Sequence, residues 1–130
     1  ETPPEFLALN SQSQALVSGE YTGKVDGVTD DHSDTSFTIT PTIRLATQKP
    51  STSKVRCCTG VCWGKNGSVY VAVHNKATGS GHVHVYDATG RFISCIIQGL
   101  YLPQGVRLTQ DDTRMVVTDY YTIKFYRIRE

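Results

Sequence analysis

The sequence predicts an all-β protein of antiparallel strands, and three observations support that fold class. The apolar residues fall into short runs rich in β-branched and aromatic side chains, which is typical of strands. Gly, Asn, Asp and Ser separate these runs and indicate turns. The two segments with any helical character, "EFLALNSQSQAL" and "TIRLATQK", are short and poorly capped. At 130 residues the chain is long enough for one domain with a buried core.

The expected strands are concentrated in the second half of the chain. Up to Ser53 the sequence is rich in Ser, Thr, Gln and Asp, and its best strand, Ser36 to Leu45, is interrupted at Pro41, which favours an edge or a bend. Thr47 to Lys54 is predicted to be a linker or long loop. From Val55 onward five strands are expected: Ser68 to His74, His82 to Asp87, Arg91 to Ile97, Arg114 to Asp119 and Thr122 to Ile128.

The second half also contains a repeat. Gly60-Val61 aligns with Gly105-Val106, a spacing of about 45 residues, and in each copy a polar turn and two apolar strands follow. A unit of this length with four short strands is typical of one blade of a β-propeller. A single blade cannot cover both faces of its sheet, so blades pack side by side.

These residues resemble the NHL-repeat β-propellers, as in the C-terminal domain of tripartite-motif (TRIM) ubiquitin ligases. The resemblance covers about residues 59–128 and is carried by "LPQGVRL", "RMVVTDYYTIKFYRI" and "VYDATGRFI". It implies four-stranded blades in a partial NHL-type propeller, with one blade at 55–98 and a C-terminal blade at 99–130. The first copy departs from the pattern at Val73, where the family often has Asp. Segment 1–54 is poorly patterned, and two interpretations stay open there, a degenerate third blade and a closing strand at Glu5 to Leu9.

Two or three blades are too few to close a ring, because propellers of this type usually have about six. The chain is therefore expected to be a fragment of a longer protein, one of several copies that share a ring, or an independent small fold. An unclosed set of blades exposes sheet faces and strand edges. We therefore expect self-association or a complementary chain that completes the ring.

Charge and hydropathy exclude some classes of partner. The chain has 13 basic and 12 acidic residues, and a formal net charge of +1 provides no strong field for nucleic acid or an anionic membrane. No apolar stretch approaches the roughly 18 residues of a membrane span. We expect a cytoplasmic protein that does not bind a membrane.

The resemblance implies a non-catalytic recognition module that binds a protein through its propeller loops, as the substrate-selecting part of a TRIM-type ligase does. The resemblance to NHL propellers is also compatible with an RNA partner. The expectation is thus a protein that is not itself an enzyme and has no cofactor. The candidate partner-binding residues are five cations near the loops and two tyrosines available for stacking: Lys54, Arg56, Lys65, Arg107, Arg114, Tyr120 and Tyr121. The alternative interpretation is that these cations are ordinary solvated charges without a binding role.

The alternative class is a metal-dependent propeller lyase or hydrolase. His82 and His84 alternate along one strand and His74 lies one strand earlier, which makes them weak zinc candidates. No Cys-x-x-Cys or His-Glu-x-x-His motif accompanies them, so no metal site is predicted. The acidic stretch "TDDHSD" lacks the closing Glu of an EF-hand calcium loop.

The four cysteines leave the redox state open. Buried reduced thiols at Cys57, Cys58, Cys62 and Cys95 are favoured over two disulfides, because adjacent cysteines need separate partners. The sequon at Asn66 to Ser68 is equally an Asn-Gly turn between strands. Cys57 to Trp63 is predicted to pack in the core, and Gly60 and Gly105 to permit tight backbone turns.

Overall fold

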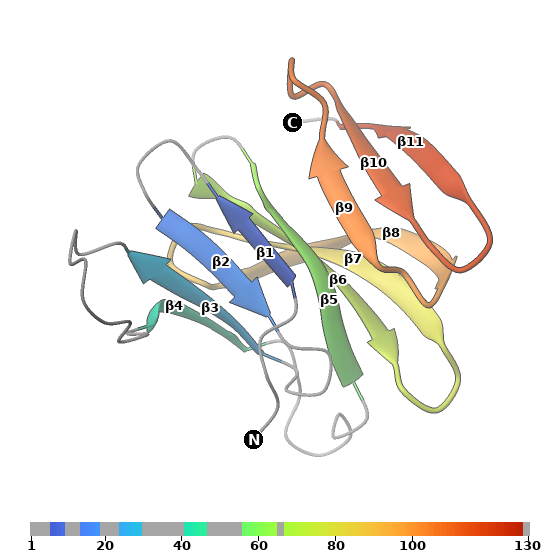
Figure 1. Ribbon diagram of the computed structural model, residues 1–130, viewed down its shortest axis with the longest axis horizontal. Helices are drawn as coiled ribbons and strands as arrows, with labels where there is room; N and C mark the ends of the chain where they lie inside the picture. The colour runs from blue at the N-terminus through green and yellow to red at the C-terminus, as the bar shows by residue number, and fades with distance from the viewer. Residues whose placement is uncertain are drawn as a thin grey trace.

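The structure is a computed structural model whose described part consists of residues 57–64 and 67–128 with their side chains, together with the backbone of Arg56 and of four N-terminal strands and the side chain of Ala8 (Figure 1). The regular structure in this part is made of β-strands, apart from one residue of 3-10 geometry at Gly67. The strands are β1 Phe6–Leu9, β2 Gln14–Ser18, β3 Lys24–Thr29, β4 Pro41–Ala46, β5 Arg56–Trp63, β6 Val69–Asn75, β7 Ser80–Tyr86, β8 Phe92–Tyr101, β9 Gly105–Leu108, β10 Arg114–Thr118 and β11 Ile123–Arg127.

The strands form three antiparallel sheets that follow one another along the chain. The first has the order β1-β2-β3-β4, the second β5-β6-β7-β8, and the third β11-β10-β9. The first strand of the middle sheet, β5, lies between the first and third sheets and contacts both β1 and β9 (Figure 1). Side-by-side packing of antiparallel blades around their first strands is the arrangement of a β-propeller. The predicted fold class, all-β with antiparallel propeller blades, is confirmed.

The N-terminal strands differ from the sequence expectation in one respect. Phe6–Leu9 pairs with β2, from Phe6 opposite Ser18 to Leu9 opposite Ala15, so it is the first strand of the first sheet and does not close the last sheet beside β11. β1 and β2 are consecutive in the chain, and pairing two strands across a short connection loses little chain entropy, which favours β2 as the partner of β1. Both segments with weak helical character contain strands. Pro41 is the first residue of β4, the place in a strand where a missing N–H is tolerated.

The middle sheet is buried on both faces. Alternate residues of β6 point to opposite sides, with Val71 and Val73 toward one cluster and Tyr70 and Ala72 toward the other. The first cluster includes Cys58, and Ala8 of β1 packs against it. The second cluster joins the middle sheet to the third and is completed by residues of β8, β9 and β10: Ile97, Leu100, Val106, Met115 and Val117. This two-sided burial explains why β6 is a continuous apolar run in the sequence.

Two glycines permit a close approach between neighbouring strands, and the prediction of tight turns at both was wrong. A Cβ on Gly60 would lie 2.6 Å from the carbonyl oxygen of Gln104, so the backbone of β5 packs directly against the start of β9. A Cβ on Gly105 would lie 2.8 Å from Oγ1 of Thr118. Neither glycine has a positive φ. The first strands of the two sheets therefore pack with almost no space between their backbones.

The four cysteines, all among the described residues, form no disulfide. Cys57, Cys58 and Cys62 are buried, and Cys95 is half-buried in β8. Burial raises the pKa of the Cys62 thiol to about 12, so it stays protonated and behaves as a small apolar side chain. The Asn66 turn lies outside the described residues. In the part of the chain that the structure describes, no helix is long and apolar enough to cross a membrane.

Candidate recognition face

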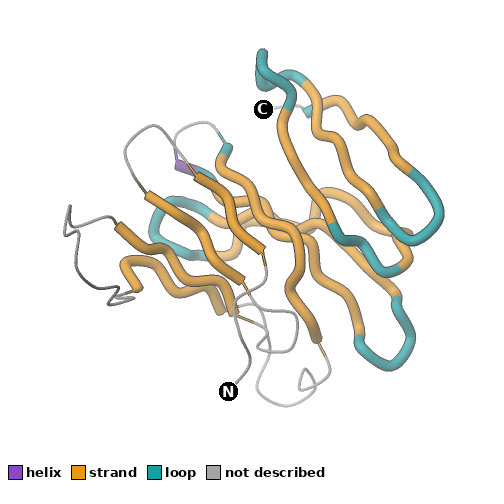
Figure 2. Tube along the Cα trace, in the orientation of Figure 1, coloured by secondary structure: helices purple, strands orange, loops and turns teal. Residues whose placement is uncertain are grey.

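Three connections meet at one end of the second and third sheets (Figure 2). They are the β6–β7 turn at 76–79, the β8–β9 connection at 102–104 and the β10–β11 turn at 119–122. Backbone hydrogen bonds link them, from Leu102 N to the carbonyl oxygen of Gly79 at 2.8 Å and from Tyr120 N to that of Tyr101 at 2.8 Å. The three connections thus form one continuous surface, which we call the tyrosine face.

Three tyrosine rings lie together on this face. The ring centroids of Tyr101 and Tyr120 are 5.6 Å apart, those of Tyr101 and Tyr121 5.6 Å, and those of Tyr120 and Tyr121 5.0 Å. Two of the three pairs are edge-to-face, a favourable geometry for aromatic rings. The side chains of Tyr120 and Tyr121 are 67% and 74% exposed. Because the rings touch one another, they form a protruding ridge and leave no open cage between them.

Asp119 holds this ridge in place. Its Oδ1 accepts hydrogen bonds from the backbone N–H groups of Tyr121 at 3.0 Å and Thr122 at 2.9 Å, and from the hydroxyl of Thr122 at 3.0 Å. Its Oδ2 accepts a hydrogen bond from the N–H of Tyr101 at 3.1 Å. Burial raises the pKa of Asp119, but the hydrogen bonds from Tyr101 and from the turn lower it by more, so this pKa lies below its ordinary value.

The ring of Tyr101 is positioned by the neighbouring turn. A Cβ on Gly79, whose φ is +77°, would lie 2.4 Å from Cε1 of Tyr101, so the ring lies directly over this glycine. The next residue after Tyr101, Leu102, has a φ of 48°, which a leucine rarely adopts. Its N–H is bonded to Gly79, and this contact holds the connection in place.

The structure brings together only some of the residues singled out in the sequence. Tyr120 and Tyr121 are on the tyrosine face. Arg114 begins β10, at the end away from the tyrosines, and Arg107 of β9 pairs with Val116 at the middle of β10. The guanidinium of Arg114 lies 5.6 Å from the ring centroid of Phe125. The candidates Lys54 and Lys65 lie outside the described residues, as does the side chain of Arg56.

Two residues of the site escaped sequence interpretation, Tyr101 and Asp119. A signal for Asp119 was available, because an Asp directly after a strand typically bonds to the N–H groups of the turn that follows. The first repeat has Val73 at the matching position, and there Asn75 bonds to the backbone N–H of Ala77 at 2.8 Å and of Thr78 at 3.1 Å. The strand of the first repeat, β6, thus continues past Val73, and Asn75, two residues later, bonds to the turn as Asp119 does in the second repeat.

The three histidines do not form a common site. His82 and His84 stack with centroids 5.9 Å apart on the face of the middle sheet that carries Val71 and Val73. His74 directly follows Val73 in β6, so its side chain points to the opposite face. Among the described residues, no group of three His, Cys, Asp or Glu side chains is placed to hold a metal ion.

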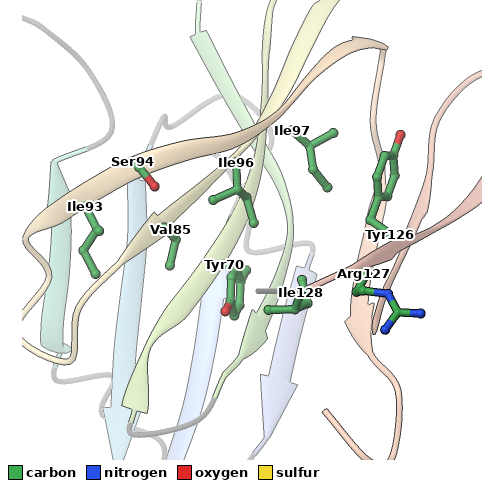
Figure 3. Close-up of a pocket in the computed structure, with 9 residues that line it drawn as sticks. All are labelled: Tyr70, Val85, Ile93, Ser94, Ile96, Ile97, Tyr126, Arg127 and Ile128. Carbon is green, nitrogen blue, oxygen red and sulfur yellow. The ribbon is translucent and has the colours of Figure 1, made fainter. Parts of the chain in front are cut away.

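A pocket of about 310 Å³ lies between the second and third sheets, away from the tyrosine face (Figure 3). Its walls come from β6, β7 and β8 of the middle sheet on one side, and from β11 and Ile128 on the other. The lining is mostly apolar, with one cation at Arg127, and includes Tyr70, Val85, Ile93, Ile96 and Tyr126.

The sequence matches no known family model and no curated protein. Solved structures do match. A Lactobacillus plantarum protein has a TM-score of 0.70 at 17% identity, covering 95% of this chain and 37% of that one. A luciferin-regenerating enzyme has a TM-score of 0.67 at 14% identity, covering 99% and 43%. The C-terminal WD40 domain of Sif2 has a TM-score of 0.66 at 14% identity, covering 98% and 38%.

These similarities establish the fold and correct one expectation. The β-propeller part of the predicted resemblance is confirmed, and the NHL assignment stays a prediction. The chain spans 37–43% of the length of these three structures. The expectation that the protein is not an enzyme is overturned, because a luciferin-regenerating enzyme shares this architecture. The fold serves enzymes and binding domains alike, so it gives no ground for excluding catalysis.

Proposed function

We propose that this chain is part of a β-propeller that recognises a protein partner through Tyr101, Tyr120 and Tyr121. The observation that carries the proposal is an exposed ridge of three tyrosines whose backbone is fixed by one carboxylate. Tyrosine is enriched among the residues that dominate binding energy at interfaces, because it buries a large apolar ring and retains a polar hydroxyl.

The rigidity of the turn supports this role. Binding normally costs about 0.5–1.5 kcal/mol for each side chain that becomes ordered. The rings of Tyr101, Tyr120 and Tyr121 already pack against one another, and Asp119 fixes the backbone that carries two of them. The ridge is therefore suited to insert into a depression on a partner surface.

The geometry favours a protein partner over RNA. Recognition of single-stranded RNA combines base stacking on aromatic rings with cations that follow the phosphates. Among the described candidates, Arg114 begins β10 at the end away from Tyr120 and Tyr121, and Arg107 pairs with Val116 at the middle of β10. The three connections of the tyrosine face contain a single cation, the exposed Lys76, whereas binding along a nucleic-acid strand neutralises several phosphates.

The finer proposal is an NHL-type propeller of a TRIM-type ubiquitin ligase, in which this face selects the protein to be modified. The order of the motifs in "LPQGVRL" and "RMVVTDYYTIKFYRI" supports it. We also propose a cytoplasmic location. No disulfide joins Cys57, Cys58, Cys62 and Cys95, which is typical of proteins in reducing compartments.

Quantitative affinity capture with matched variants tests the tyrosine ridge. The double variant Tyr120→Ala/Tyr121→Ala is expected to lose proteins that the wild type retains, by about tenfold or more. The control Gln110→Ala changes an exposed turn residue at the opposite end of the third sheet and is expected to retain them. Equal recovery by all three proteins would contradict the proposal. Capture that is sensitive to ribonuclease and falls steeply with salt would assign the face to RNA instead.

A further inference from the structure

The main-chain N–H groups of the tyrosine face are already bonded. At 77–79 they donate to Asn75, whose side-chain oxygen accepts two of these bonds and whose carbonyl oxygen accepts the third. At 101–104 and 119–122 each N–H donates to Asp119 or to a carbonyl oxygen, and Pro103 has no N–H. An added β-strand, or an anion held by main-chain groups, requires free N–H donors, and these residues provide none.

The tyrosine hydroxyls are the donors that remain. No described residue forms a hydrogen bond with the hydroxyl of Tyr101, Tyr120 or Tyr121. The three connections contain one cation, Lys76, and one carboxylate, Asp119. Asp119 accepts four hydrogen bonds, which fill the roughly four acceptor positions of a carboxylate. The face therefore offers aromatic rings and hydroxyl donors, and its carboxylate has no acceptor position left for a ligand.

The three ring planes form a stepped surface. Tyr120 is nearly perpendicular to Tyr101 and to Tyr121, at 85° and 86°, whereas Tyr101 and Tyr121 are closer to parallel, at 25°. Faces and edges of rings are thus presented next to one another. The face of an aromatic ring carries partial negative charge, which attracts the C–H groups of a saturated ring placed against it.

A proline-rich segment has the complementary chemistry. It forms the polyproline II helix, in which the carbonyl groups make no internal hydrogen bonds. Proline has no main-chain N–H, so the segment brings acceptors for the hydroxyls and no main-chain donors that would themselves require partners. A carbohydrate can also pack on aromatic rings, but its many hydroxyl groups require acceptors as well as donors. Because Asp119 is fully bonded, the face fits a proline-rich segment better.

We propose that the tyrosine face binds a proline-rich segment of its protein partner in the polyproline II conformation. This assignment rests on the proposed function and specifies the partner in it. The rings of Tyr101, Tyr120 and Tyr121 pack against the proline rings, and the hydroxyls donate to main-chain carbonyl oxygens. The furrow between successive proline rings is the depression into which the ridge inserts. Such a segment is ordered before it binds, which lowers the entropic cost of association.

A peptide of about ten prolines with blocked ends is the probe, because it forms the helix without carrying charge. The control peptide has alanine at every second position, so it keeps the length and the charge and loses half of the proline rings. Calorimetric titration measures the binding of each peptide to the protein. We expect the proline peptide to bind about tenfold or more tightly than the control peptide. Equal binding of the two, or no binding of the proline peptide, would overturn the proposal.

Two variants test the rings and the hydroxyls separately. Tyr120→Phe/Tyr121→Phe keeps the rings and removes two donors, and it should weaken binding of the proline peptide about tenfold. Tyr120→Ala/Tyr121→Ala removes the rings as well and should weaken binding further. The control Gln110→Ala should bind as the wild type does. Wild-type affinity in either tyrosine variant would contradict the proposal, and the phenylalanine variant preserves the ring contacts on which the turn packs.

Competition separates this proposal from the proposed function. Excess proline peptide is expected to release the proteins that the wild type captures, and the alanine-containing peptide is not. Proteins that Tyr120→Ala/Tyr121→Ala fails to capture, but that the proline peptide does not release, would preserve the tyrosine face as a protein-binding surface and overturn the proline-rich partner. Tighter binding of a linear glucan hexasaccharide than of the proline peptide would assign the rings to carbohydrate and overturn the proposal.

Discussion

At the scale of single residues, Asp119 accounts for more of the candidate site than any residue singled out in the sequence. One carboxylate oxygen closes the β10–β11 turn, and the other accepts the N–H of Tyr101 from a different connection. The sequence identified Tyr120 and Tyr121 because exposed aromatic residues beside a turn are recognisable locally. It did not identify Tyr101, because its contact with Tyr120 depends on how two sheets pack.

Asp119 also makes the tyrosine face sensitive to acid. Its pKa is lowered in the folded protein, so its contribution to stability is complete above the unfolded pKa of about 3.9 and is lost as the pH falls through the folded value. Asp119→Asn keeps an oxygen for the turn and loses the bond to Tyr101, because an amide nitrogen does not accept a hydrogen bond. We expect about 1 kcal/mol less stability at pH 7 and a flatter dependence on acid.

Thermal unfolding between pH 2 and pH 7 measures this difference. Asp111, whose pKa is lowered to about 2 by hydrogen bonds from the Thr109 and Thr113 hydroxyls, titrates in both proteins and serves as the internal reference. Identical pH profiles for wild type and Asp119→Asn would show that Asp119 does not couple the turn to Tyr101.

At the scale of elements, the second half of the chain was predictable because its strands have strong apolar runs and plain turns. The runs from Ser68 and from Arg114 correspond to β6 and β10. β1 and β2 were obscured, because four or five residues are too short to distinguish strand from helix periods, whereas β4 overlaps the strand predicted from Ser36 to Leu45. The role of Gly60 was also not visible locally, since the atom that would meet its Cβ comes from another sheet.

Gly60 provides a test of the packing between sheets. In Gly60→Ala the new Cβ would lie 2.6 Å from the carbonyl oxygen of Gln104, a backbone atom that cannot move away by itself. We expect a loss of about 1–3 kcal/mol in the free energy of unfolding, measured in urea. In Gly105→Ala the new Cβ meets only Oγ1 of Thr118, at 2.8 Å, which a change of rotamer relieves, so the loss should be smaller. The opposite order would show that β5 and β9 pack less closely.

At the scale of the whole molecule, the third sheet exposes apolar surface on the face that points away from the middle sheet. Phe125 and Ile123 are 60% and 70% exposed, and both alternate with residues that face the second sheet. A closed propeller covers such a face with the next blade. The chain spans 37–43% of the propellers it matches, which leaves room for further blades. The face is therefore expected to bind another blade, which a longer parent protein, a second copy or a complementary chain would supply.

Sedimentation and light scattering as a function of concentration test this expectation. We expect the protein to self-associate and the double variant Ile123→Thr/Phe125→Thr to do so less, because the substitutions remove apolar area and leave the backbone edge of β11 unchanged. A strictly monomeric wild type with one cooperative melting transition would contradict a shared ring, because an unclosed set of blades would then be stable with its face uncovered.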